Sequence, residues 1–364
     1  MRAKKPTPKP VVSPVKKEPA PKNFLLKKIP FFYTPLLLLI LFFGAFAYKY
    51  MRANGKTKVV VKNEVTPAEN CYKLFREYDF PYTQPLVLFE KEKESSELDH
   101  VKQDVSLLID QLVLRKIISS ASVYVSNLQN DKWFWINPDE RFRPASLLKI
   151  PVLMIYLKAS EKDPSVLDRK IKFNKPPDYI PDQTFKTKTL IAGNSYTIKE
   201  LFSYMIIYSD NNATHLLNKS LDVEAFQNLF TSIGMKKPVV DDRNFDMSVF
   251  DYSKFFHILY NSTYLSHTNS NYALSLLAQC EFKDGMVKGL PEGIPIAHKF
   301  GESGEVGGIR EFHESGVIYT DKGALLITIF TKGENVKTLP AAISNITEKI
   351  YNSMLNPLQA TAGS

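Results

Sequence analysis

The sequence predicts a mixed α/β fold of the α+β type, in which an antiparallel sheet is flanked by N- and C-terminal helices and carries an inserted all-helical lobe. Three observations lead to this prediction. The pattern over 98–136 reads helix, strand, strand, and the pattern after residue 295 reads strand, strand, strand, helix. Between them, 160–290 shows mainly helical periodicity. Strands joined by hairpins and bounded by two terminal helices imply an antiparallel sheet with helices on its faces. We therefore expect a cleft where the lobe meets the sheet.

The first elements follow directly from periodicity. Apolar residues at helical spacing predict an amphipathic helix over 98–117: Val101, Val105, Leu108 and Leu112. Two strands, 121–126 and 132–136, are separated by a turn rich in Asn and Asp, which predicts a hairpin. A further helix is expected to open near Ala145.

The middle and the end of the chain read similarly. Thr197 and Glu200 form a capping-box pattern that predicts a helix through Tyr208. Four more helical stretches are expected at 213–221, 223–233, 251–261 and 271–279. Three strands are expected at 296–300, 316–319 and 324–331. A last helix over 339–354 has Pro340 in its first turn, where proline is tolerated.

Positive charge is concentrated at the N-terminus. The formal net charge is +9, and residues 1–28 alone contribute +8. The rest of the chain is therefore nearly neutral, so the sequence predicts no nucleic-acid partner. Twenty uncharged residues, 29–48, follow the basic tail and are long enough for one membrane-spanning helix. The positive-inside rule keeps the tail in the cytoplasm and places the remainder outside the cell membrane.

The alternative to an uncleaved anchor is a signal peptide, because Ala45-Phe46-Ala47 has the form of a cleavage site. With an uncleaved anchor, the predicted organisation has five parts. They are a basic, Pro-rich tail (1–28), a transmembrane helix (29–48), a stalk or extended linker (49–97), a catalytic domain (98–355) and a flexible tail (356–364). The only two cysteines, Cys71 and Cys280, either pair in the exported protein or remain free buried thiols. The histidines show no metal-ligand spacing, so neither a metal nor another cofactor is expected.

Three short motifs lie at the junctions of this plan. In Ser146-Leu147-Leu148-Lys149, residues three apart on a helix share a face, so the Lys149 amine can stand beside the Ser146 hydroxyl. The positive end of the helix favours a developing anion at the serine. Burial and neighbouring positive charge would lower the lysine pKa and make it a base.

The second motif, Ser209-Asp210-Asn211, is expected in a turn between two helices of the lobe. Ser209 could relay a proton to a leaving amine, and the Asn211 amide could hold a substrate carbonyl or the lysine. The third motif, Lys299-Phe300-Gly301, ends a strand and is followed by Glu302-Ser303. A strand edge facing the serine would supply a cation, a backbone carbonyl and an N–H donor.

In this order and on these elements, the three motifs resemble those of the serine penicillin-binding proteins and β-lactamases, and most closely the class A β-lactamase-related family. The flanking sequences 141–146 and 205–214 are similar in style to that family, and the resemblance covers about 98–355. It implies the fold described above and a serine nucleophile that is acylated by its substrate.

The resemblance also implies roles for the matching positions. Ser146 would be the acylated nucleophile and Lys149 its activator. Ser209 and Asn211 would act as proton relay and substrate clamp, and Lys299 would bind the substrate carboxylate. The expected oxyanion hole consists of the backbone N–H groups of Ser146 and Glu302.

Two departures from the family pattern matter for function. The family's deacylating glutamate lies in a Glu-x-x-Leu-Asn pattern, which the segment 239–248 lacks. Its acids, Asp241, Asp242 and Asp246, are expected in solvent or paired with Arg243. Phe300 stands where the family usually has a hydroxyl for the substrate carboxylate, and Ser303 is a candidate to replace that hydroxyl.

The sequence therefore predicts a membrane-anchored extracytoplasmic serine hydrolase that forms an acyl-enzyme on Ser146. The expected substrates are β-lactams or the D-Ala-D-Ala-like ends of cell-wall peptides. Two alternatives remain open. One is a catalytically silent module that binds cell-wall peptide. The other is a D,D-peptidase or esterase without β-lactamase turnover.

Overall fold

The computed structural model describes residues 72–76, 85–91, 93–177, 183–185, 187–239 and 245–355, all within the compact unit Lys58–Ser364. The predicted tail, the predicted span and the C-terminal tail lie outside these residues, as does Cys71. Within the described ranges, no helix is both long and apolar enough to cross a membrane. The placement of 29–48 in a membrane therefore stays a prediction.

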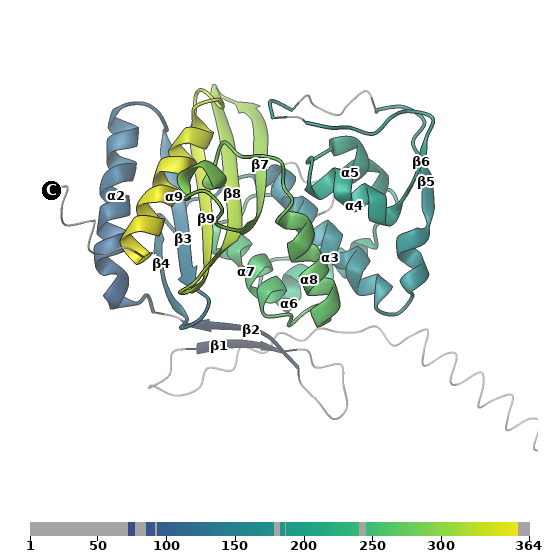
Figure 1. Ribbon diagram of the computed structural model, residues 1–364, viewed down its shortest axis with the longest axis horizontal. Helices are drawn as coiled ribbons and strands as arrows, with labels where there is room; N and C mark the ends of the chain where they lie inside the picture. The colour runs from purple at the N-terminus through teal and green to yellow at the C-terminus, as the bar shows by residue number, and fades with distance from the viewer. Residues whose placement is uncertain are drawn as a thin grey trace, which may run out of the picture. The chain divides into compact units, whose positions relative to one another are not determined.

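The centre of the fold is a five-stranded antiparallel sheet (Figure 1). Its strands run in the order β4-β3-β9-β8-β7, so β4 and β7 form its edges. Their bounds are β3 Ser120–Asn127, β4 Lys132–Ile136, β7 Ile296–Val306, β8 Ile309–Thr320 and β9 Gly323–Gly333. The predicted hairpin of β3 and β4 is confirmed, with Asn127 opposite Lys132 at its turn. The structure confirms the predicted α+β class.

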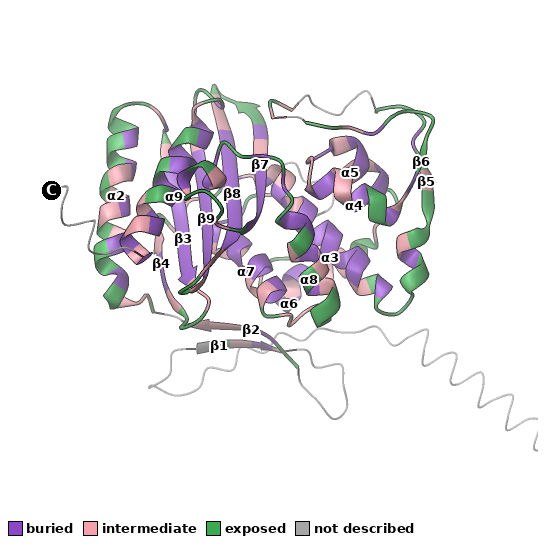
Figure 2. Cartoon of the chain, in the orientation of Figure 1, coloured by how far each residue is buried: buried purple, intermediate pink, exposed green. Residues whose placement is uncertain are grey.

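The two terminal helices, α2 Asp99–Leu114 and α9 Leu339–Leu355, lie together over one face of the sheet (Figure 1). Figure 2 shows that the strands and the sheet-facing sides of these helices are buried. Four fully buried aliphatic side chains fill the layer between them: Val101, Val105, Ile343 and Ile346. Because each such burial contributes roughly 1.5–3 kcal/mol, this layer holds the two helices onto the sheet.

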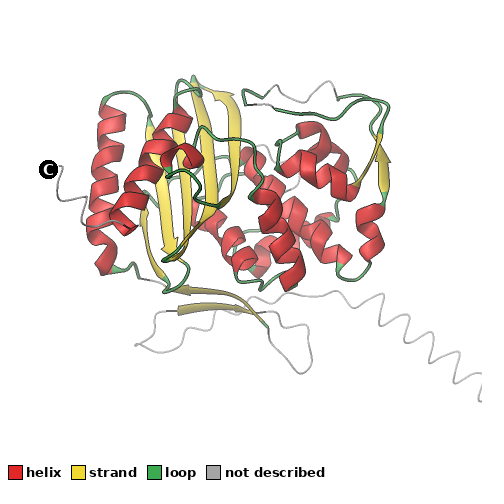
Figure 3. Cartoon of the chain, in the orientation of Figure 1, coloured by secondary structure: helices red, strands yellow, loops and turns green. Residues whose placement is uncertain are grey.

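Helices of the inserted lobe form the other side of the fold (Figure 3). They are α3 Lys149–Ser160, α4 Ile198–Ile206, α5 Asn211–Asn218, α6 Val223–Ser232, α7 Val249–Tyr260 and α8 His267–Leu277. The predicted capping box of α4 is present, since Thr197 Oγ1 accepts from Glu200 N and Glu200 Oε2 accepts from Thr197 N. A two-stranded sheet of β5 Lys170–Lys172 and β6 Ser195–Thr197 borders the lobe.

The structure differs from the sequence prediction in β8, which begins seven residues earlier than expected, at Ile309. Polar residues in its first half give it the composition of a loop. In the fold they are buried and paired: Glu311 with Arg143, and Glu314 with His298. The local composition of this segment therefore did not predict an interior strand, because its polar groups are satisfied by partners elsewhere in the chain.

Part of the region expected to be an extended linker forms a hairpin of β1 Tyr72–Arg76 and β2 Leu86–Lys91. The Glu90 side chain is largely buried, with Oε1 3.0 Å from the Lys254 amine on α7. Phe75 and Leu88 join the main hydrophobic core. This hairpin is therefore packed onto the folded unit.

Candidate active site

Ser146 lies in a short 3-10 helix, η3 Ala145–Leu148, that leads directly into α3. Ala145 has φ of 50°, in the left-handed region that non-glycine residues rarely adopt. Such strained positions are concentrated at functional sites. Ser146 is half-buried, and among the described residues its hydroxyl has no hydrogen-bond partner. It is therefore available at the start of the helix, while Lys149 is almost completely buried.

The Ser209 motif occupies the turn between α4 and α5, as predicted. Asp210 is the N-cap of α5 and accepts from the backbone N–H groups of Asn212 and Ala213. Its carboxylate also binds Thr189 Oγ1. Ser209 has φ of 55° and is fully buried. The Asp210 cap thus fixes a turn that holds Ser209 in an unusual conformation.

The three motifs meet at Ser209. Lys149 Nζ donates to Ser209 O at 2.6 Å, to Ser209 Oγ at 3.1 Å and to Asn211 Oδ1 at 2.9 Å. Lys299 Nζ donates to the same Ser209 Oγ at 2.8 Å and to Phe300 O at 2.8 Å. With both lysines as donors, the two lone pairs of the hydroxyl are used and its proton is free to point elsewhere. This geometry suits a proton relay.

Burial makes both lysines lose a proton more easily than an exposed lysine does. Burial and the Lys299 charge hold the pKa of Lys149 well below 10.5, and Asp210 and Glu302 only partly oppose them. Burial lowers the pKa of Lys299 to about 8. A lysine that is neutral for part of the time can accept the proton of a serine hydroxyl.

Gly301 on β7 brings the third motif against η3. A Cβ atom at this position would lie 2.8 Å from Pro144 O and 3.1 Å from Leu147 N. The backbone of β7 thus contacts the turn that carries Ser146, and only a residue without a side chain permits this approach.

We predict that Gly301→Ala destabilises the protein by about 1–3 kcal/mol, because a backbone atom must move to admit the methyl group. Displacing η3 also misplaces Ser146, so its acylation should slow by up to about 10²-fold. Gly304→Ala is the matched control, since nothing lies within 4 Å of its added Cβ. Urea denaturation and acylation rates measure both effects. Equal behaviour of the two variants would contradict the prediction.

Phe300 is buried in an aromatic cluster rather than lining the site with a polar group. Its ring lies 4.5 Å from Phe282 and 5.8 Å from Phe312 between centroids, and Phe185 packs 5.3 Å from Phe282. A cavity of about 340 Å³ next to this cluster is lined by Thr184, Phe185, Phe282 and Phe300 among others. Phe300 therefore places an apolar ring where the family usually has a hydroxyl that donates to the substrate carboxylate.

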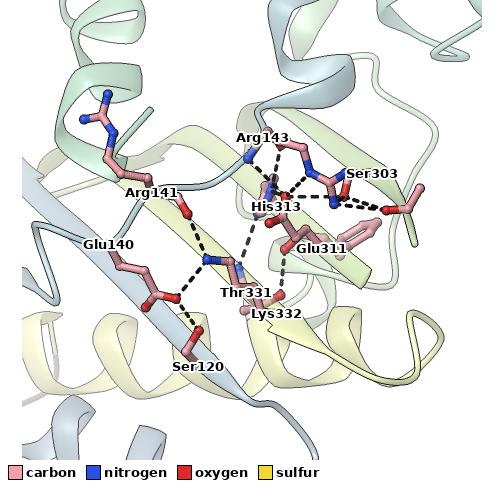
Figure 4. A network of polar contacts seen from close by, with 11 residues as sticks. Ser120, Glu140, Arg141, Arg143, Ser303, Glu311, His313, Thr331 and Lys332 are labelled. Carbon is pink, nitrogen blue, oxygen red and sulfur yellow. Dashed lines mark hydrogen bonds and ion pairs between the residues drawn. The ribbon is translucent and has the colours of Figure 1, made fainter. Parts of the chain in front are cut away.

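Ser303 belongs to a separate polar network (Figure 4). Its hydroxyl accepts from Arg143 Nη2 at 3.0 Å and donates to Glu311 Oε2 at 3.3 Å. The Arg143 guanidinium is also 3.4 Å from Glu311. His313 Nε2 lies 3.1 Å from Arg143 O, and its Nδ1 accepts from Thr331 N. These contacts hold the segment before Ser146 against the sheet. The Ser303 hydroxyl is bonded to Arg143 and Glu311 and makes no hydrogen bond to Lys149 or Lys299 among the described residues.

Two residues that the sequence analysis did not single out reach the site from a loop. Gln183 Nε2 donates to Ser209 O at 2.9 Å, and Thr184 N donates to Glu302 Oε1 at 2.6 Å. They therefore connect the Ser209 turn to the edge of β7. No local pattern marks them. The capping role of Asp210, by contrast, could have been recognised from its position before a helix.

The segment 239–248, which lacks the family's deacylating-glutamate pattern, is only partly described. Asp246 is exposed, whereas Asp241, Asp242 and Arg243 lie outside the described residues. Cys280 is a free buried thiol. In the part of the chain that the structure describes, no group of three His, Cys, Asp or Glu residues is placed to hold a metal ion.

Comparison with known proteins identifies the family. The sequence profile of the β-lactamase enzyme family matches residues 108–354, more than half of the chain. The chain belongs to the β-lactamase enzyme family. The matched range includes all three motifs, so the family membership predicted from them is confirmed. A search of curated protein sequences finds no significant match.

Solved structures of β-lactamase-family proteins share the fold. A β-lactamase from Sphaerobacter thermophilus is 22% identical with a TM-score of 0.58, covering 70% of this chain and 97% of its own. A β-lactamase from Chitinophaga pinensis is 18% identical with a TM-score of 0.61, covering 70% and 99%. PBP-A is 20% identical with a TM-score of 0.58, covering 72% and 97%. At these identities the likeness establishes the fold alone.

Proposed function

We propose that this β-lactamase-family protein is a serine acyl hydrolase that works through an acyl-enzyme on Ser146. The observation that carries the proposal is the convergence of Lys149 and Lys299 on Ser209 Oγ beside η3. A nucleophile, a low-pKa amine and a relay hydroxyl on rigid elements are the parts that acyl transfer requires.

In the proposed reaction, Lys149 takes the Ser146 proton as Oγ adds to the substrate carbonyl. The bond from the carbonyl carbon to the leaving group then breaks. The leaving group receives the proton through Ser209, and the acyl group remains on Ser146 as an ester. Water hydrolyses the ester, releasing a carboxylic acid and restoring the hydroxyl. Ser146 N–H and Glu302 N–H are the proposed oxyanion donors.

The proposed substrates are β-lactams or the D-Ala-D-Ala-like ends of cell-wall peptides. A structural neighbour, a PBP-A variant, has been crystallised as an acyl-enzyme with penicillin G, which supports testing a lactam first. The basic tail and apolar stretch of the sequence support a single-pass membrane anchor with the hydrolase domain outside the cell.

The test is intact-protein mass spectrometry of the full-length protein after incubation with penicillin G and with an activated N-acyl-glycyl thioester. We expect an adduct that peptide mapping places on Ser146, and no adduct in Ser146→Ala. Ser275→Ala, an exposed serine on α8, is the control and should react as wild type. A short-lived adduct would mean that water hydrolyses the acyl-enzyme with the help of another base, although the family's Glu-x-x-Leu-Asn pattern is absent.

If no reagent labels the wild-type protein, the acyl-enzyme proposal fails. A catalytically silent binding module becomes the better description if Ser146→Ala also leaves affinity for cell-wall peptide unchanged.

A further inference from the structure

Glu302 follows Gly301 on β7, and its carboxylate is close enough to Lys149 to raise the pKa of that amine. Its Oε1 accepts from Thr184 N, and the neighbouring Gln183 donates to Ser209 O. Two adjacent residues thus link the Glu302 carboxylate to the turn that holds both lysines.

The second carboxylate oxygen lacks a partner. Glu302 Oε2 is buried, and among the described residues it has no hydrogen bond. A buried acceptor without a donor costs free energy, and the cost is larger for a charged group. Oε1 already accepts a backbone amide N–H from Thr184. The group is therefore an acceptor with one position left for another N–H donor.

The cations that the structure describes near Glu302 make their hydrogen bonds to other groups. Lys149 donates to Ser209 and Asn211. Lys299 is fully buried, donates to Ser209 Oγ and Phe300 O, and lies 4.1 Å from the centre of the Phe300 ring. Arg143 is bound to Glu311 and Ser303. Phe300 offers no hydroxyl. An incoming carboxylate would thus meet the negative charge of Glu302, with no hydroxyl at Phe300 to bind it and with both lysines already donating to Ser209 Oγ.

We propose that Glu302 determines specificity by accepting a hydrogen bond from an N–H donor on the substrate's leaving group, so that a carboxamide end is preferred to a carboxylate end. The inference rests on the proposed acyl-enzyme at Ser146. It predicts that substrates with a carboxylate on the leaving group, which include β-lactams and D-Ala-D-Ala-like ends, react more slowly than substrates with a carboxamide there. Acyl transfer is unchanged: Oγ forms the ester, the carbonyl–leaving-group bond breaks, and the leaving group departs with the serine proton. Only the far end of the leaving group contacts Glu302.

The experiment compares two thioesters of N-benzoylglycine, one with mercaptoacetic acid and one with mercaptoacetamide. They differ only in a carboxylate or a carboxamide at the end of the leaving group. Thiol release by the full-length protein in detergent micelles gives kcat/KM for each. We expect the amide to be preferred by at least about tenfold, because like charges in a partly buried site repel strongly.

Glu302→Gln removes the charge while keeping the shape, and should reduce this preference by about tenfold or more. Glu302→Thr, which offers a hydroxyl in place of the carboxylate, should also favour the acid relative to wild type. Glu305→Gln is the matched control, because Glu305 is exposed three residues further along β7. It should keep the wild-type ratio.

A wild-type protein that prefers the acid, or a ratio that neither Glu302 variant changes, overturns the specificity proposal alone. Accumulation of acyl-enzyme from both thioesters in Glu302→Gln also overturns it and assigns Glu302 to deacylation. If neither thioester acylates Ser146 in the wild type, the proposed function fails and this inference fails with it.

Discussion

Replacing Lys149 with methionine is expected to slow acylation of Ser146 by about 10²- to 10⁴-fold, the usual contribution of a positioned general base. Methionine fills the buried space but accepts no proton. The amine it removes makes three hydrogen bonds, to Ser209 O, Ser209 Oγ and Asn211 Oδ1. Stopped-flow release of thiol from the N-benzoylglycyl thioesters measures the rate.

The variant Lys149→Arg tests whether Lys149 acts as a base or only supplies a positive charge. Arginine keeps the positive charge but does not deprotonate in proteins, so acylation should stay slow. In wild type the rate should rise with pH as Lys149 loses its proton, at a pKa well below 10.5 because of burial and the Lys299 charge. Lys162→Met, at an exposed lysine just beyond α3, is the control. Fast acylation by Lys149→Arg would rule out Lys149 as the base.

Glu314→Gln is expected to lower the free energy of unfolding by about 3–5 kcal/mol, the cost of leaving a buried charge without its partner. Glu314 Oε1 lies 2.6 Å from His298 Nδ1, and both side chains are fully buried. Its Oε2 accepts from Met286 N at 2.9 Å. The pair joins β7 to β8, and His298 directly precedes Lys299 on β7.

The same pair predicts a pH dependence. Burial lowers the pKa of His298, but Cys280 and Glu314 more than offset it and raise the pKa to about 9, above the ordinary 6.5. A raised folded-state pKa gives stability that is full below about pH 6.5 and is lost as the pH rises towards 9. Urea denaturation between pH 6 and pH 9.5 should show this decline in wild type and a smaller one in Glu314→Gln. The exposed Glu348→Gln is the control and should change stability by less than about 0.5 kcal/mol.

Much of the fold was predictable because its signals are local. The capping box of Thr197 and Glu200, the β3–β4 turn and the last helix each depend on residues a few positions apart. The first half of β8 was not predictable in this way. His313 and Glu314 resemble loop residues until their buried partners are known.

The order of the three motifs determined which residues are candidates for catalysis, and the charge of the tail determined the predicted topology. Only the tertiary structure decided what surrounds Ser146. The contact between Thr184 and Glu302 joins residues 118 positions apart, and Phe300 faces an aromatic cluster assembled from separate elements. Periodicity and spacing report neighbours along the chain. Contacts across a fold depend on packing, so the specificity proposed for Glu302 could be inferred only from the folded protein.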